Sequence, residues 1–139
     1  MILGCMKDFY KMEGIKFNRD RSREAIENLM VKKSIGRIWI ILADDKPVGY
    51  CSMAFSYTLE NYGRDCFLDE LYIKPQYRLK GIGSEVMKQI EAYLIKQGLK
   101  AIHLYVNDPN SSAYKYYLKN GFSRHKASYM TKIIERSVL

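Results

Sequence analysis

The chain has 139 residues, a formal net charge of +8, and a composition that is 47% hydrophobic and 13% aromatic. This length predicts one domain that spans residues 1–139. No apolar run approaches the roughly 20 residues that cross a bilayer, which excludes a transmembrane protein, and the apolar content excludes a disordered chain. The first residues lack a basic segment ahead of their apolar ones, so we expect no secretory signal and a cytoplasmic location.

The first half of the chain predicts two helices followed by a hairpin and a further strand. Helical spacing of apolar residues over 2–10 predicts an opening amphipathic helix. A second, short helix follows Asp20 or Ser22, and its predicted inner face consists of Ala25, Ile26, Leu29 and Met30. Residues 37–43 and 48–57 read as two strands joined by a polar turn, and a third strand runs from Phe67 to Ile73.

The second half alternates helices and strands. A periodic helix begins at about Ile82 and stops at Gly98, and a strand over 101–106 follows it, which predicts a right-handed parallel crossover. Asn110 is the predicted N-cap of the next helix and Gly121 its C′ residue. Residues 122–134 predict a last strand or a bent hairpin. Together the two halves predict an α+β (α/β) fold built on a mixed sheet.

Three cysteines, Cys5, Cys51 and Cys66, are odd in number and widely spaced. No C-x-x-C pair accompanies them, and His103 and His125 do not stand at the spacing of metal ligands. We therefore expect free, buried or half-buried thiols in a reducing compartment, and no metal site.

Charge is segregated along the chain. Residues 1–40 hold nine Lys/Arg and five Asp/Glu (+4), residues 41–73 hold two and six (−4), and residues 74–103 and 104–139 each hold six and two (+4). An acidic middle followed by a basic second half indicates a cationic ligand near the first and an anionic ligand near the second. Ordinary solvated charges would give the same pattern.

The most informative segment is the glycine loop, Arg78-Leu-Lys-Gly-Ile-Gly-Ser84, between a predicted strand and a predicted helix. Its glycines let the backbone approach a ligand closely, the helix N-terminus adds a positive partial charge, and Arg78 and Lys80 add full charges. The loop is not a P-loop, which ends in Gly-Lys-Ser/Thr, nor the dinucleotide fingerprint, which needs a third glycine. These features predict a cradle for pyrophosphate.

Arg78-x-x-Gly81-x-Gly83 resembles the acetyl-coenzyme A signature of the GNAT family of N-acetyltransferases, (Arg/Gln)-x-x-Gly-x-(Gly/Ala). The resemblance covers residues 67–83 and resumes at Asn110-Ser-Ser-Ala-Tyr-Lys-Tyr-Tyr-Leu-Lys-Asn-Gly-Phe122. Within the family, the sequence from Phe67 is nearest to the small-amine, diamine and polyamine acetyltransferases. The resemblance implies a mostly antiparallel sheet with a splayed parallel pair, helices on both faces, and acetyl transfer from acetyl-coenzyme A to a primary amine of a small, cationic acceptor.

The resemblance also implies roles for individual residues. The backbone of one strand end would bind the pantetheine arm, at Leu71, Tyr72 and Ile73. The backbone of the glycine loop would bind the pyrophosphate, at Arg78, Leu79, Lys80, Gly81, Ile82, Gly83 and Ser84. Asn110 matches a position that contacts the pantetheine, the small side chain of Ala113 leaves room for a ligand, and Tyr117 matches the tyrosine that protonates the leaving thiolate.

The reaction also needs a base, because an ammonium must lose a proton before its nitrogen can attack a thioester. Asp69 and Glu70 are the candidates. As neighbours on one strand they face opposite sides of the sheet unless a bulge rotates the strand, and either could be the base. The other acidic residues of the middle segment could attract a cationic acceptor or could be hairpin-turn and loop residues: Asp44, Asp45, Glu60 and Asp65.

One feature departs from the family, whose members usually begin with a strand, whereas this sequence opens on the predicted helix. A missing first edge strand would expose a sheet edge and favour a homodimer or strand exchange. Two alternative functions remain open. One is a family member that binds an acyl-coenzyme A as a sensor without turnover, and the other is a basic nucleic-acid-binding protein, for which no recognition motif is present.

Overall fold

The computed structural model describes residues 1–135 and divides into two compact units. The first, Met1–Leu104, contains helices α1 (Ile2–Glu13), α2 (Arg19–Val31) and α3 (Ile82–Lys96), and strands β1 (Gly36–Ala43), β2 (Lys46–Thr58), β3 (Gly63–Ile73) and β4 (Ile102–His103). The second begins at Tyr105, and its described part contains one helix, α4 (Ser112–Lys119). These elements confirm most of the predicted order.

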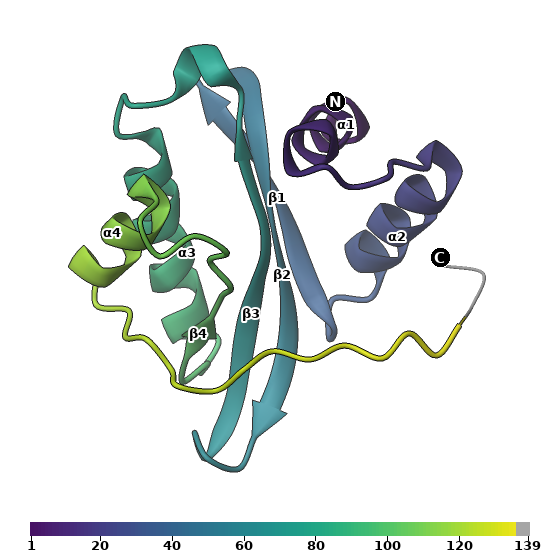
Figure 1. Cartoon of the computed structure of the whole chain (residues 1–139). Coiled ribbons are helices and arrows are strands. Elements are labelled where there is room, and N and C mark those ends of the chain that lie inside the picture. Colours follow the sequence, from purple (N-terminus) through teal and green to yellow (C-terminus); the bar gives the residue numbers. More distant parts are fainter. Residues whose placement is uncertain (136–139) are drawn as a thin grey trace. The chain divides into compact units, whose positions relative to one another are not determined.

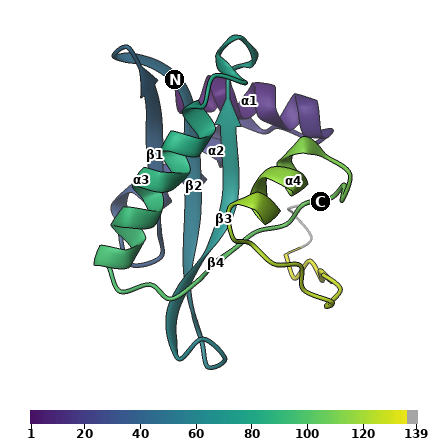
Figure 2. The same ribbon diagram turned by 90° about the vertical axis from the view of Figure 1, so that its left-hand side faces the viewer.

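The four strands form one mixed sheet in the order β1-β2-β3-β4. The first three strands are antiparallel and β4 is parallel to β3, as predicted. Helices α1 and α2 cover one face of the sheet and α3 covers the other (Figure 1; Figure 2 views the α3 side). Within the described residues no strand precedes α1, and β1 forms an edge of the sheet.

The parallel pair is short. Only Cys66 and Phe67 of β3 pair with β4, through Ile102 and His103, so the strand is much shorter than the predicted 101–106. Strand β3 continues to Ile73 without β4 beside it. The two strands therefore splay after one short contact, as the family resemblance implies.

A bulge at Asp69 divides β3 into two halves that present their side chains differently. Met53 on β2 pairs with Leu68, but the next residue, Ser52, pairs with Glu70, so Asp69 is the extra residue. An extra residue reverses which face the following side chains occupy. Cys66, whose thiol contacts the Met53 sulfur at 3.8 Å, therefore lies on the opposite face from Glu70.

Each face of the sheet has its own apolar core. On the α1 and α2 side the buried residues are Cys5, Met6, Ile26, Tyr50 and Tyr72. On the α3 side the helix buries Met87, Ile90 and Leu94, and the ring of Tyr93 meets that of Trp39 on β1 at 5.6 Å. Burial on both faces accounts for the long apolar runs of the strands.

Helix α2 begins at Arg19, at least two residues earlier than predicted, and its inner face differs. The side chain of Asn18 accepts a hydrogen bond from the Arg21 N–H at 3.1 Å and caps the helix. Ser22 and Ile26 are buried, whereas Ala25 and Met30 are exposed, so the predicted inner face is wrong at those two positions. A helix that packs on one sheet face buries a narrow stripe of residues spaced i, i+4. Ser22 and Ile26 have this spacing, so Ser22 is buried although it is polar.

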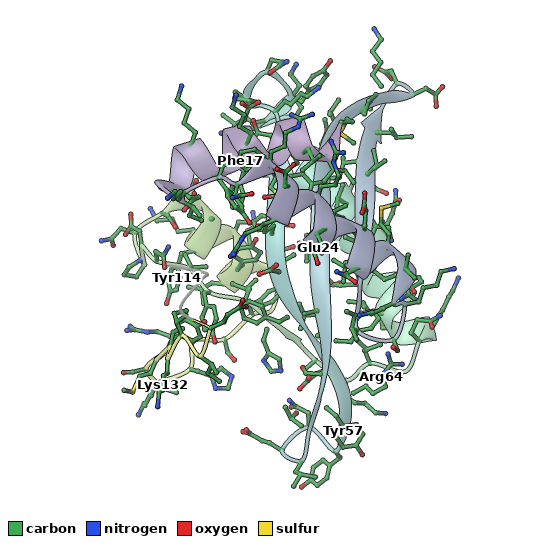
Figure 3. The ribbon with its side chains drawn as sticks, turned by 90° about the vertical axis from the view of Figure 1, so that its right-hand side faces the viewer. Phe17, Glu24, Tyr57, Arg64, Tyr114 and Lys132 are labelled. Carbon is green, nitrogen blue, oxygen red and sulfur yellow. The ribbon has the colours of Figure 1, made fainter. Side chains whose placement is uncertain are left out.

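The two hairpin turns contain three of the acidic residues of the middle segment. Asp44 and Asp45 form the β1–β2 turn with φ of 49° and 59°, the left-handed pair that a type I′ turn requires. Glu60 lies in the turn between β2 and β3. Figure 3 views the face carrying α1 and α2 and shows Tyr57 and Arg64 near this second turn. Asp44, Asp45 and Glu60 are thus turn residues, whereas Asp65 lies within β3 and is buried, so the hairpin-turn or loop alternative is wrong for Asp65.

The second unit differs from prediction at both ends of α4. The Ser111 hydroxyl accepts from the Tyr114 N–H at 3.1 Å, so Ser111 is the N-cap and the assignment to Asn110 is wrong. The Asn110 N–H instead donates to the Asp108 carboxylate at 2.8 Å, because Asp and Asn both form tight local turns. Gly121 has φ of 89°, as a C′ glycine should. Residues 122–135 form no strand, contrary to prediction, because a β-rich run needs a partner strand.

Candidate active site

Among residues 1–135, no strand pairs with one backbone edge at the end of β3. The Lys74 N–H donates to the Val48 carbonyl at 2.9 Å, on the β2 side. Because hydrogen-bonding direction alternates along an antiparallel strand, the backbone groups of Leu71 and Ile73 face away from β2. Strand β4 does not pair with this stretch. This edge is the one that the family resemblance assigns to the pantetheine arm.

The glycine loop joins this edge to α3. Leu79 and Gly81 have φ of 58° and 77°, and Gly81 is the N-cap of α3 without a side-chain hydrogen bond from any described residue. The first amides of a helix have no partner within the helix. A Cβ at Gly81 would meet no atom within 4 Å, and one at Gly83 would meet only Ile73 Cδ1, at 3.6 Å. The loop thus combines helix amides that have no partner within the helix with open space beside Gly81 and Gly83, which fits an anionic phosphate group.

The two basic residues of the loop rest on aromatic rings. The Arg78 guanidinium lies 5.4 Å from the Tyr72 ring centre, and its Nε donates to the Ile73 carbonyl at 2.7 Å. The Lys80 ammonium lies 5.7 Å from the ring centre of Tyr77. Arg78 therefore ties the loop to the end of β3 in addition to supplying charge, a role that the sequence pattern does not reveal.

Glu70 is held by two tyrosines from different elements. The Tyr50 hydroxyl donates to Glu70 Oε2 at 2.7 Å, and the Tyr10 hydroxyl of α1 lies near enough to the same carboxylate to affect its pKa. Burial raises the pKa of Glu70, the two hydroxyls lower it, and neighbouring Asp69 raises it. Burial and the Glu70 carboxylate raise the pKa of both tyrosines. The tyrosines therefore remain neutral donors.

Asp69 differs from Glu70 although the two are adjacent. It is the bulged residue, and its side chain reaches solvent while partial burial of the carboxyl raises its pKa. From the sequence, a bulge is the feature that would change which side these residues face. That bulge is present, and it directs Glu70 towards α1. Sequence reasoning missed Tyr10 and Tyr50, for which the available signal is that a buried tyrosine hydroxyl requires a hydrogen-bond partner.

Three predicted site residues belong to the second unit. Tyr117 of α4 packs its ring against Tyr116 and Phe122, with centroids 5.3 and 5.2 Å away. Ala113 is exposed in the first turn of the same helix, and Asn110 precedes it. Asn110, Ala113 and Tyr117 therefore all belong to one helix and the turn before it.

The cysteines are free and buried, as expected. Burial raises the pKa of Cys51 and Cys66 to about 12, so these thiols are not poised for reaction. Among residues 1–135 no three His, Cys, Asp or Glu side chains group as metal ligands would. In the same part of the chain, no helix has the length and apolarity needed to span a bilayer.

The chain belongs to the acetyltransferase (GNAT) family, whose model matches residues 5–122. It is 32% identical over 82 residues to the thialysine N-epsilon-acetyltransferase of Bos taurus, covering 56% of this chain and 48% of the relative. It is 40% identical over 52 residues to the spermidine N(1)-acetyltransferase of Thermoplasma acidophilum, covering 37% of this chain and 32% of the relative. The chain thus spans about half or less of these relatives.

Solved structures share the fold. A predicted acetyltransferase from Clostridium acetobutylicum, determined with acetyl-CoA, superposes with a TM-score of 0.75 at 19% identity, covering 94% of this chain and 86% of that one. At this identity the likeness supports the fold alone. The predicted family and the predicted α+β architecture are therefore confirmed.

Proposed function

We propose that the chain is a single N-acetyltransferase domain, residues 1–139, that transfers an acetyl group from acetyl-coenzyme A to a primary amine of a small, cationic acceptor. One observation carries this proposal. The uncovered edge of β3 at Leu71–Ile73 leads into the glycine loop, and Glu70 immediately precedes that edge. One continuous stretch of chain can thus provide the proton acceptor, an edge for the pantetheine arm and a loop for the pyrophosphate.

The chain's own groups would bind coenzyme A as follows. The N–H groups of Leu71 and Ile73 are available to the amide-rich pantetheine arm, as a strand edge would be to another strand. The first-turn amides of α3 and the ammonium of Lys80 would bind the pyrophosphate. Asn110 and Ala113 would contact the pantetheine from the α4 segment. Acetyl-coenzyme A supplies the activated acyl group, and the protein supplies its position.

Acetyl transfer moves protons at two places. A carboxylate takes one proton from the acceptor ammonium, and the freed nitrogen lone pair forms the new bond to the thioester carbon. The carbon–sulfur bond breaks, and the thiolate takes a proton from the Tyr117 hydroxyl. The nitrogen loses its second proton as the amide forms, so the net release is one proton for each amide and thiol produced.

We propose Glu70 rather than Asp69 as the proton acceptor. Its carboxylate accepts a hydrogen bond from Tyr50 and lies near the Tyr10 hydroxyl, whereas Asp69 is the bulged residue and its side chain reaches solvent. Burial raises the pKa of Glu70 from its usual value, which makes the carboxylate a better base near neutral pH. Asp69 would then contribute negative charge that attracts a cationic amine.

The acceptor class follows from charge. Two adjacent carboxylates precede the uncovered edge of β3, and the two relatives named above are acetyltransferases of thialysine and of spermidine, which supports an amine acceptor here.

We also propose that the exposed edge strand β1, whose Ile40 and Leu42 are 52% and 57% exposed, supports a homodimer. Light scattering after gel filtration would show a single monomeric mass if that proposal is wrong.

Release of free thiol from acetyl-coenzyme A in the presence of polyamines, aminoglycosides, lysine analogues and N-terminal peptides tests the function. Transfer predicts amine-dependent thiol release together with an acetylated product in the mass spectrum. A sensor predicts coenzyme A binding without thiol release for every amine. A nucleic-acid-binding protein predicts salt-dependent binding of DNA or RNA and no affinity for coenzyme A.

A further inference from the structure

On the basis of the acetyl transfer proposed above, we propose that Tyr10 and Tyr50 are positioning residues that orient the Glu70 carboxylate and keep it ionised to accept the proton of the amine. The two tyrosines come from different elements, α1 and β2, and they converge on one carboxylate of β3. Neither belongs to the motifs that carry the family resemblance.

The Tyr50 contact is set by the sheet. Tyr50 is fully buried and pairs across the strands with Tyr72, while Ser52 pairs with Glu70. Tyr50 and Glu70 are therefore diagonal neighbours on one face, and the hydroxyl reaches Oε2 at 2.7 Å. The Asp69 bulge is what places Glu70 on this face, because without the extra residue Glu70 would share the face of Cys66.

The Tyr10 contact is set by the packing of α1. The Tyr10 ring meets Phe9 and Phe17 with centroids 6.1 Å away in each case, and Phe17 belongs to the connection between α1 and α2 (Figure 3). This aromatic packing holds the tyrosine at the sheet, where its hydroxyl acts on the Glu70 carboxylate. Helix α1 therefore does more than cover the core, because it supplies the second donor to the carboxylate.

The other charged and titratable groups on this side of the sheet do not lower the pKa of Glu70. Asp69 from β3 raises the pKa of Glu70 together with burial, and only the two hydroxyls lower it. From α1, Cys5 lies near Tyr50, and Asp8 lies near Cys5 and Tyr72. The cations of that group are Lys74 and the N-terminal ammonium, which act on Cys5, and Arg78, which acts on Tyr72. The hydroxyls are thus the groups that maintain the charged form of Glu70.

The arrangement leaves capacity for the substrate. A carboxylate can accept about four hydrogen bonds, so two tyrosine donors leave positions for an ammonium N–H. In the proton transfer, the N–H bond breaks and an O–H bond forms on Glu70, while both tyrosines keep their protons. The lone pair on nitrogen is then available to the thioester carbon.

The test compares Tyr10→Phe and Tyr50→Phe with the control Tyr93→Phe. Each variant keeps its ring, and Tyr93 loses a hydroxyl that accepts from Arg37 at 2.9 Å on the α3 side of the sheet. We expect the acidic limb of the kcat/KM profile to move to higher pH in both test variants, with about a tenfold loss below that limb, and to stay in place in Tyr93→Phe. Thermal midpoints and coenzyme A affinity of the folded variants separate this effect from a loss of packing.

A carbon-13 NMR titration of the Glu70 carboxyl keeps the test independent of turnover. The proposal predicts a higher titration midpoint in Tyr10→Phe and Tyr50→Phe than in the wild type. An unchanged midpoint in both variants overturns the proposal, and so does a moved midpoint with an unmoved kcat/KM limb, because Glu70 is then held but is not the proton acceptor. If no amine is acetylated by the wild type, the proposed function fails and the catalytic role of the tyrosines fails with it, while a moved midpoint would still establish the hydrogen bonds.

Discussion

Leu68 and Glu70 lie two residues apart on β3 and face opposite sides of the sheet, because Asp69 bulges between them. In a regular strand both side chains would share a face. Here Leu68 lies on the α3 side with Cys66, and Glu70 lies on the α1 side with its two tyrosines. The bulge immediately precedes the uncovered edge of β3, so the carboxylate and that edge belong to one short segment.

Replacing the two carboxylates separately distinguishes their roles. We expect Glu70→Gln to lower kcat/KM for an amine about a hundredfold or more, because general base catalysis contributes on that scale. Asp69→Asn should raise KM for a cationic acceptor and leave kcat within a few-fold, because it removes charge and no proton acceptor. Steady-state kinetics with one accepted amine measures both. A larger kcat loss in Asp69→Asn would reverse the assignment.

Gly81 and Gly98 form a matched pair for testing the glycine loop. Their φ values are 77° and 74°, and a Cβ at either would meet no atom within 4 Å. Alanine at either position should destabilise the fold by about 1 kcal/mol, because both glycines are left-handed. Only Gly81→Ala should weaken coenzyme A binding, by roughly tenfold, because its methyl group enters the space assigned to the pyrophosphate.

Calorimetric titration with coenzyme A, together with thermal unfolding, measures both effects. Equal affinities in Gly81→Ala and Gly98→Ala would place the pyrophosphate elsewhere.

Tyr117→Phe tests the proposed acid. The ring contacts with Tyr116 and Phe122 survive the substitution, so we expect normal folding and normal coenzyme A affinity. Turnover should fall about a hundredfold, because the thiolate must then leave without a proton donor. Tyr116→Phe is the neighbouring control and should retain wild-type turnover. Single-turnover thiol release compares the two, and equal rates would exclude Tyr117 from the reaction.

Asp65 should make the protein sensitive to acid. It is fully buried, and although burial would raise its pKa, hydrogen bonds from Ser56, Thr58, His103 and Asn61 outweigh burial and lower the pKa to about 2. The carboxylate therefore stabilises the fold above the unfolded-state value of 3.8. That contribution, about 2 kcal/mol, should be lost as pH falls from about 4 to about 2.

Urea unfolding across this pH range measures the loss. Asp65→Asn should be less stable than the wild type at pH 7 and should show a flatter dependence below pH 4. Asp45→Asn, in an exposed left-handed turn that Asn tolerates, is the control and should keep the wild-type slope. A wild-type slope in Asp65→Asn would mean that another group causes the acid sensitivity.

The local features of the fold could be predicted from sequence because they depend on nearby residues. Periodicity located α1 and α3, and alternation with Asp44-Asp45 located the first hairpin. The glycine loop could be predicted because the glycines and the start of the helix are both visible in the local sequence. Errors arose where two similar signals competed, as at Asn110 and Ser111, both good N-cap residues.

The remaining features depend on contacts between distant segments. Nothing local to Asp69 marks it as a bulge, since the register of β3 is set by its pairing with β2. The contact of Tyr10 with Glu70 joins the first helix to the third strand, and that of His103 with Asp65 at 3.1 Å joins β4 to β3. Tertiary packing decides such contacts, and a single sequence does not display them.

The most direct test of the central claim is the coupled measurement of thiol release and product mass with acetyl-coenzyme A and the amine panel, run on the wild type and Glu70→Gln side by side. We predict thiol release by the wild type that requires an amine, an acetylated primary amine as product, and a loss of about a hundredfold or more in Glu70→Gln. Coenzyme A binding with no amine-dependent thiol release across the whole panel would contradict the assignment as an N-acetyltransferase.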